Sequence, residues 1–383
     1  MNGLLIVANW PSDVGYAWWF MERIWVELAN RQAAAGGTTH IIFPEVRGVS
    51  RTLADLPVVI HELDFSERTP ANRKRLRKLV AQHDIRAVYL TDRPSLDPWY
   101  ALMRIWGIRV IVNNDQTPGD RDTSRFKRVA KSSLHRLRLF SPDLSVAPSR
   151  FVLDRFTRIY GLPAGRCRLI PNGVEPIEIS KFDPGYVHRE FGLPDDAVVV
   201  VSLSRAVEYK GIPLIIACAD RLINDEGRKD LYFVHCGDGP DIDAFRARVA
   251  ELGLTKHFLL PGARPDYHSI LPSCDIALHA SKGEGFSLAI LECMSAALPI
   301  LVPDNSGNRE AVEHGVSGFC YEAGSVDAIL VALRDLLDNA ELRQRVGSAA
   351  RDAVLQRFTL QRTLNRFATE VSPLLAGAQP AVV

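Results

Sequence analysis

The sequence predicts an α/β protein made of two doubly wound domains, each built on a parallel sheet. Short apolar segments typical of buried strands alternate with helical patterns along most of the 383 residues. The alternation restarts at Val198-Val199-Val200-Val201-Ser202-Leu203, a run typical of a strand buried on both faces. A chain of this length is also long for one domain and comfortable for two. We therefore expect a first domain at 1–180, a connection at 181–196 and a second domain at 197–360.

The first domain is expected to alternate strands and helices from its start. The expected strands are short apolar runs at 4–8, 40–43, 58–60, 87–90, 110–112 and 144–147. The expected helices lie at 16–35, 73–82, 98–106, 125–140 and 150–160. Gly36-Gly37 ends the first of these helices, and Ser149 is a suitable N-cap for the last.

The second domain repeats this alternation. Its expected strands lie at 198–203, 232–236, 258–261, 275–279 and 300–302, and its expected helices at 213–224, 242–252, 287–297 and 326–339. Further helices at 341–374 close the domain, and residues 377–383 are expected to be disordered. Arg205, Gly237, Gly262 and Glu284 each follow a predicted strand directly. Because ligands bind beyond the carboxyl ends of parallel strands, we expect these four residues to face one site.

The segment from Glu284 to Glu292 carries the clearest chemical signal. It lies at a strand-to-helix junction, with Glu284 in the loop and Glu292 a little over one turn inside the helix. Ser287 or Ser281 is expected to cap the first free amides. A helix N-terminus attracts phosphate, whereas a carboxylate there accepts hydrogen bonds from sugar hydroxyls. The pair therefore predicts a ligand that is both polyol and phosphate, namely a nucleotide sugar.

Several motifs flank this segment in a recognisable order. They are His235-Cys236-Gly237-Asp238-Gly239-Pro240, Leu260-Pro261-Gly262-Ala263, Ala297-Leu298-Pro299-Ile300-Leu301-Val302-Pro303, Ser306-Gly307-Asn308-Arg309-Glu310 and Gly315-Val316-Ser317-Gly318-Phe319. With them, residues 165–370 resemble the retaining family-4 glycosyltransferases (glycosyl transferases group 1) of the GT-B fold, and the first half resembles them weakly. The resemblance implies two Rossmann-like domains that face a central cleft, with a C-terminal helix in 361–383 that crosses back to the first domain.

The resemblance also implies roles for single residues. Arg205 and Lys210 are expected to stabilise the leaving diphosphate without a metal, and Glu292 to hold the ribose hydroxyls. Glu284 is expected near the reacting carbon of the donor sugar, although not as a covalent nucleophile. The remaining donor contacts are backbone groups of Gly285, Phe286, Ser287 and Leu288, the base-side residues Gly262 and Ala263 with Arg264, and Gly15 beside the diphosphate.

The chain departs from its relatives in the loop 113–120. Many relatives carry a histidine there, near the reacting carbon, whereas this chain has Asn114, Asp115 and Gln116. An amide cannot exchange a proton near neutral pH. Asp115 is therefore expected to act on the acceptor side, either as a base or as a positioning group.

Composition excludes several other kinds of site. None of the six cysteines forms a CxxC pair, and the ten histidines show no ligand spacing, so neither a metal site nor a cofactor is expected. No apolar run reaches the roughly 18 residues of a membrane span. The N-terminal segment lacks the basic start of a signal peptide, so a cytoplasmic location is expected.

The overall charge of +1 conceals an asymmetry. Residues 1–185 contain 27 Lys and Arg against 19 Asp and Glu, whereas the remainder contains 19 against 26. Much of the basic excess lies at 73–78 and 125–138. This pattern indicates an anionic partner for the first half, such as the inner face of a membrane beside a lipid-linked or glycan acceptor. Nucleic acid is not expected, because no nucleic-acid-binding motif accompanies the charge.

Three interpretations remain open on sequence. The favoured one is a retaining, metal-independent glycosyltransferase that builds a polysaccharide or glycoconjugate from a nucleoside-diphosphate sugar. A second is an epimerase or phosphorylase on the same fold. A third is a catalytically silent scaffold that binds nucleotide sugar, which the missing histidine would permit.

Overall fold

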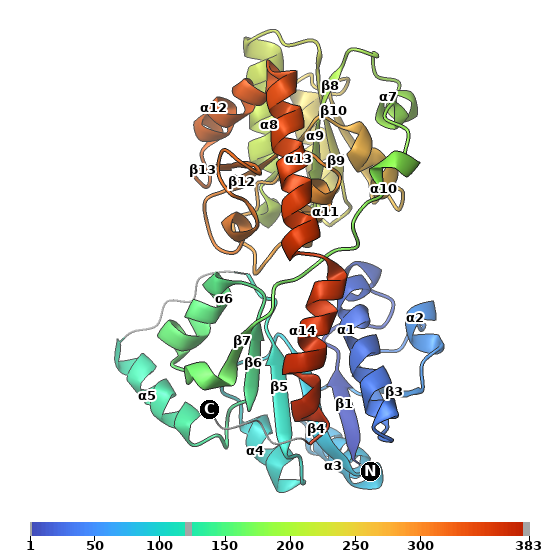
Figure 1. The fold of residues 1–383 in the computed structure, drawn as a ribbon, viewed down its shortest axis with the longest axis vertical. Helices are drawn as coiled ribbons and strands as arrows, with labels where there is room; N and C mark the ends of the chain where they lie inside the picture. The colour runs from blue at the N-terminus through green and yellow to red at the C-terminus, as the bar shows by residue number, and fades with distance from the viewer. Residues whose placement is uncertain (1, 119–124, 378–383) are drawn as a thin grey trace. The chain divides into compact units, whose positions relative to one another are not determined.

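The protein was analysed as a computed structural model that describes residues 2–118 and 125–377, without the side chains of residues 15–18 and 125–130. The chain forms two compact units (Figure 1). The first contains Met1–Pro171 and Gln361–Val383, and the second contains Asn172–Leu360. The end of the predicted 113–120 loop and all but the first residue of the predicted disordered tail lie outside the described residues.

The first unit is built on a parallel sheet of seven strands in the order β3-β2-β1-β4-β5-β6-β7. Its strands are β1 (Gly3–Val7), β2 (Thr39–Phe43), β3 (Val58–Glu62), β4 (Ile85–Thr91), β5 (Val110–Asn114), β6 (Leu144–Ala147) and β7 (Cys167–Leu169). Its helices are α1 (Gly15–Ala34), α2 (Arg51–Ala54), α3 (Pro70–Gln82), α4 (Pro98–Ile105), α5 (Arg125–Arg136), α6 (Arg150–Asp154), α14 (Leu360–Glu370) and α15 (Ser372–Leu375). The first residue of α14, Leu360, belongs to the second unit, and the rest of α14 belongs to the first.

Helices cover both faces of this sheet. Leu5 and Val7 of β1 pack in one apolar cluster with Leu76 of α3 and Trp99 of α4. On the other face, the ring of Trp25 in α1 lies 6.0 Å from that of Phe43 in β2. Ser149 caps α6 by accepting a hydrogen bond from the Val152 amide, as predicted.

The second unit is built on a parallel sheet of six strands in the order β10-β9-β8-β11-β12-β13. Its strands are β8 (Val198–Leu203), β9 (Leu231–Cys236), β10 (Phe258–Gly262), β11 (Ile276–Leu278), β12 (Ile300–Pro303) and β13 (Phe319–Tyr321). Its helices are α7 (Tyr186–Phe191), α8 (Ile212–Asp220), α9 (Ile242–Glu251), α10 (Tyr267–Ile270), α11 (Leu288–Ser295), α12 (Val326–Leu337) and α13 (Ala340–Arg357).

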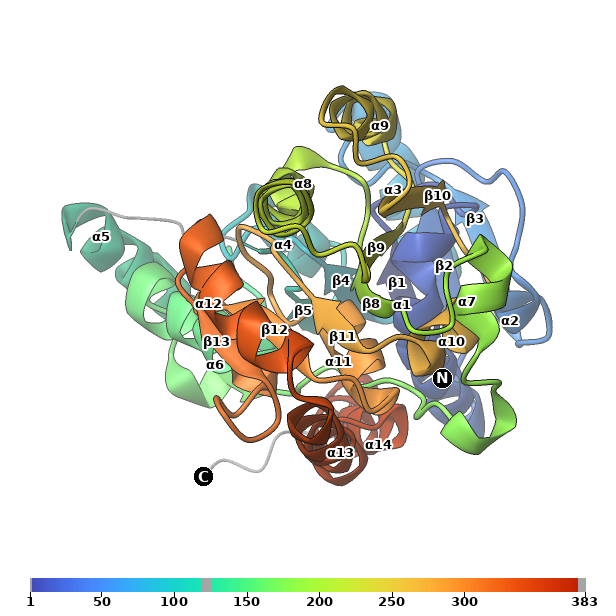
Figure 2. The same ribbon diagram turned by 90° about the horizontal axis from the view of Figure 1, so that it is seen from above.

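Alternate residues of β8 point into two separate apolar layers, which explains the run of four valines. Val199 and Val201 pack in the layer that contains α11 and α13, whereas Val200 packs in the layer that contains α8 and α12. Figure 2 shows α8 and α9 on one side of this sheet and α11 and α13 on the other. The predicted fold class, two doubly wound Rossmann-like units, is therefore confirmed.

Both sheets reverse their strand order beside their first strand. In the second unit, β9 lies on one side of β8 and β11 on the other. The chain leaves β8 and β11 in opposite directions along the sheet, which opens a space beyond their carboxyl ends. This position is where ligands bind in open α/β sheets, and the predicted donor residues follow these two strands.

The division between the units differs from the predicted one. Residues 172–180 belong to the second unit, not to the first domain. Val174 and Ile177 are buried in the core of the second unit, and the Val174 amide donates to Phe358 O over 3.0 Å. Part of the predicted connection also forms α7. Apolar burial and a backbone bridge decide this boundary, and neither is visible from composition.

Among the described residues, the strands β7 and β13 and the short helices α2, α7 and α10 were not predicted. The strands β7 and β13 contain three residues each and lie at the edges of their sheets. A segment of this length is too short to show a period of two. The helix α2 contains four residues and is capped by Ser50, whose Oγ accepts from the Leu53 amide.

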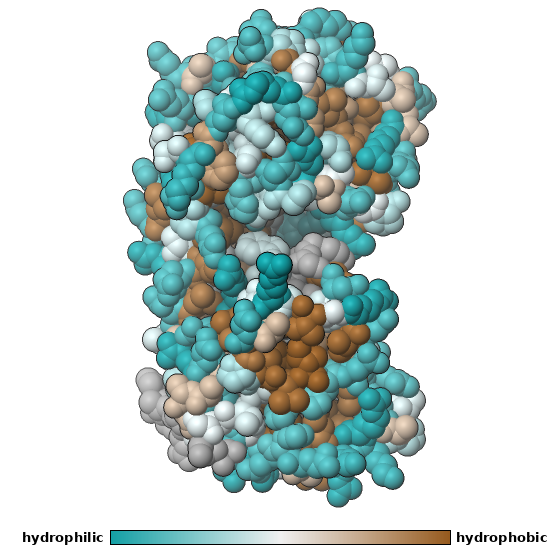
Figure 3. Space-filling model, turned by 90° about the vertical axis from the view of Figure 1, so that its right-hand side faces the viewer, coloured by the Kyte–Doolittle hydropathy of each residue, from teal (hydrophilic) through white to brown (hydrophobic). Residues whose placement is uncertain are grey.

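Figure 3 shows apolar residues gathered on part of the surface of the first unit. Over its whole surface, the first unit has several exposed large apolar residues. They include Val59 of the edge strand β3, Ile105 at the end of α4, and Leu134, Leu137 and Leu139 at and just after the end of α5. No helix in the described part of the chain is long and apolar enough to span a membrane. All six cysteines are free thiols.

Candidate functional site

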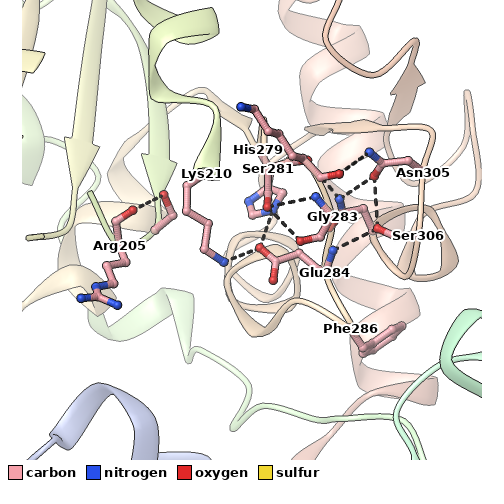
Figure 4. Close-up of polar contacts among 12 residues, drawn as sticks. Arg205, Lys210, His279, Ser281, Gly283, Glu284, Phe286, Asn305 and Ser306 are labelled. Atoms are coloured by element: carbon pink, nitrogen blue, oxygen red, sulfur yellow. Dashed lines mark hydrogen bonds and ion pairs between the residues drawn. The ribbon is translucent and has the colours of Figure 1, made fainter. Parts of the chain in front are cut away.

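An ion pair between Lys210 and Glu284 joins the two loops at the switch point of the second sheet. Lys210 ends the 3₁₀ turn Glu208–Lys210 after β8, and Glu284 lies between β11 and α11. The Lys210 ammonium donates to Glu284 Oε1, and Figure 4 shows the two side chains pointing toward one another. The two side chains are 24% and 12% exposed, so the pair is largely shielded from solvent.

Glycine at position 211 allows these two loops to meet. Gly211 has a φ of +74°, which L side chains rarely adopt. A Cβ atom at this position would lie 2.0 Å from Ala280 O, so any side chain would push the β11 loop away. The contact is reinforced by the Lys282 amide, which donates to Tyr209 O over 2.9 Å.

A third loop, after β12, binds the backbone of Glu284. The Glu284 amide donates to Ser306 Oγ over 3.0 Å, and the Gly307 amide donates to Glu284 O over 3.0 Å (Figure 4). A Cβ atom on Gly307 would lie 2.0 Å from Gly285 O. Asn305 extends the support by donating to Lys282 O over 3.0 Å. The motif at 306–310 thus holds the loop that carries Glu284.

His279 provides a second partner for the Glu284 carboxylate. It follows β11 directly, is 5% exposed, and places Nε2 3.5 Å from Glu284 Oε1 (Figure 4). Its backbone is fixed on both sides, because its amide donates to Leu301 O and its carbonyl accepts from the Tyr321 hydroxyl. Lys210 and His279 therefore contact the same oxygen of Glu284.

These neighbours keep Glu284 ionised. Burial by itself would raise the pKa of Glu284, but the charge of Lys210 and the contact with His279 outweigh burial and lower that pKa to about 2. Glu284 is therefore a fixed anion at neutral pH. Its charge is balanced by Lys210.

The N-terminus of α11 begins just after Glu284. Ser287 occupies the N-cap position, but its side chain makes no capping hydrogen bond, contrary to the expectation. Ser281 Oγ instead contacts Gly283 within its own loop. In the part of the chain that the structure describes, the amides of Gly285, Phe286, Ser287 and Leu288 donate no recorded hydrogen bond. Four adjacent N–H groups are thus available to a ligand oxygen.

Phe286 contributes its backbone rather than its ring to this loop. Its side chain is buried in the apolar core, with its ring centroid 5.3 Å from that of Phe358. Its carbonyl accepts a 3.0 Å hydrogen bond from Asn172 Nδ2. Core packing and this bond fix the direction in which the neighbouring amides point.

Glu292 lies inside α11, with its carboxylate on Tyr267 of α10. The Tyr267 hydroxyl donates to Glu292 Oε1 over 2.9 Å. Burial raises the pKa of Glu292 to about 7, and the hydrogen bond from Tyr267 opposes this rise. No cation is recorded next to Glu292 among the described residues. The surroundings thus lower the pKa of Glu284 and raise that of Glu292.

The base-side residues Gly262 and Ala263 follow β10 as expected. Gly262 O accepts from the Gly237 amide over 2.9 Å, which joins the loops after β9 and β10. Arg264 does not point freely into solvent, because its guanidinium donates to Asp266 and to Glu190 of α7 over 2.6–2.7 Å. Arg264 and the Tyr186 hydroxyl hold the pKa of Asp266 well below its usual range. Arg264 therefore fixes this loop to α7.

Arg205 follows β8, as predicted, and its side chain is exposed. Figure 4 shows its guanidinium pointing away from the pair formed by Lys210 and Glu284. The two cations predicted to act together are therefore placed differently in this structure. Lys210 is held by Glu284, whereas Arg205 faces outward from the loop.

Gly15, predicted beside the diphosphate, and the acceptor-side residue Asp115 belong to the first unit. Gly15 begins α1, after the loop that follows β1. Asp115 follows β5 and has both oxygens engaged: Oδ2 pairs with Arg155 Nη2 over 3.1 Å, and Oδ1 accepts from the amide and hydroxyl of Thr117. Of the two expected roles, these contacts favour positioning over proton exchange, because a base needs a free oxygen.

Asn114 and Gln116 are also held by neighbours. Asn114 Nδ2 donates to the Tyr89 hydroxyl over 2.9 Å, and Gln116 Nε2 donates to Asn114 Oδ1 over 3.1 Å. The Gln116 amide donates to Asp92, which follows β4 and has a φ of +54°. Burial, with the nearby charge of Asp115, raises the pKa of Asp92 to about 7. Sequence reasoning missed Asp92, although it directly follows a predicted strand.

His279, Tyr267 and Ser306 were also missed. Each supports a predicted glutamate and becomes visible only when the loops are assembled. For His279 a signal was available, since it lies at the carboxyl end of a predicted strand. Within residues 2–118 and 125–377, no three His, Cys, Asp or Glu side chains are grouped so that they could hold a metal.

Comparisons with known proteins identify the family of the chain. Residues 21–178 match the family model described as Glycosyltransferase Family 4, and residues 187–353 match the one described as Glycosyl transferases group 1. The chain is 26% identical to the GDP-mannose-dependent alpha-(1-6)-phosphatidylinositol monomannoside mannosyltransferase of Mycolicibacterium smegmatis over 336 residues, which cover 85% of each protein.

Solved structures share the fold. A glycosyltransferase from Rickettsia africae superposes with a TM-score of 0.77 at 20% identity, covering 99% of both chains. HepE from Anabaena, in complex with UDP, superposes with a TM-score of 0.73 at 18% identity, covering 97% of this chain and 100% of that one. At these identities the likeness shows the architecture alone.

Proposed function

The chain belongs to the group 1 and family 4 glycosyltransferases of the GT-B fold, and we propose that it transfers a sugar from a nucleoside-diphosphate sugar to a glycan or lipid-linked acceptor with retention of configuration. The observation that carries this proposal is the pair of Lys210 and Glu284 at the switch point of the second sheet. A cation and a fixed anion, beside four available amides, match a donor that carries both phosphate and sugar hydroxyls.

Each side of the donor has a matching group. The α11 amides and the cations Lys210 and Arg205 suit the diphosphate, whose negative charge grows as the bond to the sugar breaks. Glu284, ionised by its neighbours, suits the hydroxyls of the donor sugar. Glu292, held by Tyr267 further along α11, suits the ribose hydroxyls. Gly262 and Ala263 are assigned to the base, and Gly15 of the first unit to the diphosphate, by family resemblance.

The proposed reaction needs no covalent intermediate on the protein. The acceptor hydroxyl attacks the anomeric carbon from the face that the diphosphate leaves, and the carbon–oxygen bond to phosphate breaks. The proton of the acceptor hydroxyl passes to an oxygen of the departing phosphate. Glu284 is unsuited to be the nucleophile, because a salt-bridged and nearly buried carboxylate is stabilised as an anion. No resident metal is proposed, since Lys210 and Arg205 supply the positive charge.

The proposed acceptor side lies at an anionic membrane surface on the cytoplasmic side. The exposed apolar residues Leu134, Leu137 and Leu139 follow one another near the basic residues Arg136 and Arg138. Apolar residues that insert among lipid headgroups, next to cations that bind them, are typical of a peripheral membrane contact. The basic helix α3 is a second candidate for the same contact.

A donor screen tests the proposal. The purified protein is heated alone and with UDP-glucose, UDP-N-acetylglucosamine, ADP-glucose or GDP-mannose, with the free sugars as controls. A true donor at a hundred times its Kd stabilises the protein by about 2.7 kcal/mol. Stabilisation by at least one nucleotide sugar, but by none of the free sugars, is expected. If none of the nucleotide sugars raises the unfolding temperature, the donor site is assigned wrongly.

A catalytically silent scaffold is the second candidate function. It is favoured by one observation: the loop that carries a histidine in many relatives here holds Asn114 and Asp115, which are bound to Tyr89 and Arg155. Slow hydrolysis of the bound donor distinguishes the two functions, because a transferase without its acceptor commonly passes the sugar to water. Release of free sugar that is lost in the Lys210→Ala variant would exclude the scaffold.

A further inference from the structure

We propose that donor binding makes the protein take up a proton at His279, which then replaces Lys210 as the cation beside Glu284. The inference rests on the proposed function, because it requires the donor diphosphate to bind at Lys210. It assigns to His279 a positioning role beside Glu284.

In the proposed donor complex, the Lys210 ammonium faces two anions, the Glu284 carboxylate and the diphosphate. The ammonium is bound to Glu284 Oε1, which it neutralises. In the proposed complex the diphosphate brings two further negative charges to Lys210 and Arg205. The Lys210 ammonium can contact both anions, but the two positive charges cannot balance three negative ones. Glu284 therefore becomes under-compensated when the donor enters.

Glu284 cannot relieve this imbalance through solvent. Its side chain is 12% exposed, and a buried carboxylate without a cation is costly. The loop that carries Glu284 is held in place, since the Glu284 amide and carbonyl are bound by Ser306 and Gly307. A second cation must therefore come to Glu284, or Glu284 itself must take a proton.

His279 is placed to become that cation. Its Nε2 lies 3.5 Å from Glu284 Oε1, is buried, and has no hydrogen-bond partner among the described residues. The imidazole of histidine is the side chain that most often changes charge in response to a neighbouring group. Once protonated, Nε2 donates to Glu284 and holds the carboxylate toward the donor sugar.

Three other elements reach His279. From the turn after β8, the charged neighbour is Lys210, which contacts the same carboxylate oxygen of Glu284. From β13, the Tyr321 phenol donates to His279 O, and burial holds the pKa of that phenol well above its usual value. From β12, the backbone oxygen of Leu301 accepts from the His279 amide. His279 is therefore the group that responds to the charge of Glu284.

The number of protons bound with the donor is measurable by titration calorimetry. UDP-glucose, UDP-N-acetylglucosamine and GDP-mannose are titrated at pH 7 in buffers of different ionisation enthalpy. Nucleotide sugars are chosen over nucleoside diphosphates, because a terminal phosphate has its own pKa of about 6 and would bind protons itself. The comparison is between wild type and His279→Gln, which keeps a donor near Glu284 but cannot be charged. Glu292 titrates in both proteins, so its contribution cancels.

We expect wild type to take up between half a proton and one proton more than His279→Gln. Between pH 7 and 8 the donor affinity of wild type should fall relative to that of His279→Gln, by at most tenfold. His314→Gln, a change at an exposed histidine of the same unit, should bind protons as wild type does. If His279→Gln does not fold, His279→Asn gives the same test, since its side chain also cannot be charged.

The outcomes separate the inference from the proposed function. A donor that binds wild type and the variants with equal proton uptake overturns the role of His279 and leaves the donor site standing. If none of the three nucleotide sugars binds wild type, both the donor site and the inference are wrong.

Discussion

The Tyr267 hydroxyl donates a 2.9 Å hydrogen bond to Glu292, a carboxyl that no recorded cation accompanies in the described structure. Glu284, eight positions earlier, is bound by Lys210 and contacted by His279. The same segment thus holds one glutamate that costs stability when ionised and one that is stabilised as an anion. This contrast gives the two residues different responses to pH and to mutation.

Glu292→Gln should stabilise the unliganded protein at alkaline pH and weaken donor binding. The pKa of Glu292 is raised from an ordinary 4.5 to about 7, so its protonated form stabilises the folded protein. That stability is complete below pH 4.5 and is lost as pH rises through 7. The variant should therefore exceed wild type by up to about 3 kcal/mol at pH 8, and match it near pH 4.5.

Urea unfolding at pH 4.5, 6 and 8 measures this difference, and calorimetry measures the loss of donor affinity. Losing a charge-assisted hydrogen bond to ribose is expected to weaken binding by about 1.5–3 kcal/mol. Glu322→Gln, a change at an exposed glutamate of the same unit, is the control. Equal stability of the Glu292 variant and wild type at pH 8 would show that Glu292 is not forced toward neutrality.

Lys210→Ala and Arg205→Ala should lower turnover more than donor affinity. Their charge matters most as the diphosphate leaves, and removal of such a group costs about 10²–10³ in rate. Single-turnover kinetics with saturating donor checks this. Lys282→Ala is a matched control, because Lys282 lies in the same loop region but is paired with the exposed Glu208. Rates within twofold of wild type for both test variants would show that these residues only form part of the loop and do not stabilise the leaving diphosphate.

Gly307→Ala should disturb the Glu284 loop without touching the donor. Its Cβ would lie 2.0 Å from Gly285 O, so the loop that carries Glu284 must shift. Such overpacking costs about 1–3 kcal/mol of stability, and the shift should weaken both turnover and donor binding. Gly165→Ala is the control, since a Cβ there meets nothing within 4 Å. A fully active Gly307 variant would mean that the position of Glu284 tolerates movement.

Activity should survive EDTA. The proposed positive charge at the diphosphate comes from Lys210 and Arg205, so a chelator has no ion to remove. The measurement is initial rate after dialysis against EDTA, with and without added Mg²⁺ or Mn²⁺. Loss of activity that either metal restores would require a metal in the donor complex.

Binding to membranes should be salt-sensitive and need acidic lipid. Each basic residue near an anionic surface contributes about 1 kcal/mol, and this falls off within about 8 Å at physiological salt. Co-sedimentation with neutral and anionic liposomes, at low and high salt, tests this in wild type. A variant with Arg73, Lys74, Arg75, Arg77 and Lys78 changed to Gln tests α3, and one with Leu134, Leu137 and Leu139 changed to Ser tests the end of α5. No binding of wild type to anionic liposomes at low salt would indicate a soluble acceptor.

Much of the fold follows from local patterns. The valine run of β8 predicts a strand buried on both faces, and the two apolar layers of the second unit explain why. Ser149 predicts the start of α6 because an N-cap hydrogen bond is formed within three residues. Local signals fail where packing over long sequence separations decides. Val174 joins the second unit through a bridge to Thr359, 185 positions further along the chain.

The sequence by itself determined the two Rossmann-like sheets and the family. It also placed Arg205, Lys210 and Glu284 in loops after predicted strands, and Glu292 inside a predicted helix. Each depends on short-range periodicity or on motifs whose spacing is written in the chain. Only the tertiary structure decided which of these groups are charged and which partners hold them. His279 and Lys210 contact the same oxygen of Glu284 from separate loops. The two carboxylate oxygens of Asp115 are bound by Arg155 and Thr117. Charge state depends on burial and on neighbours within a few ångströms, and folding brings those neighbours together from distant parts of the sequence.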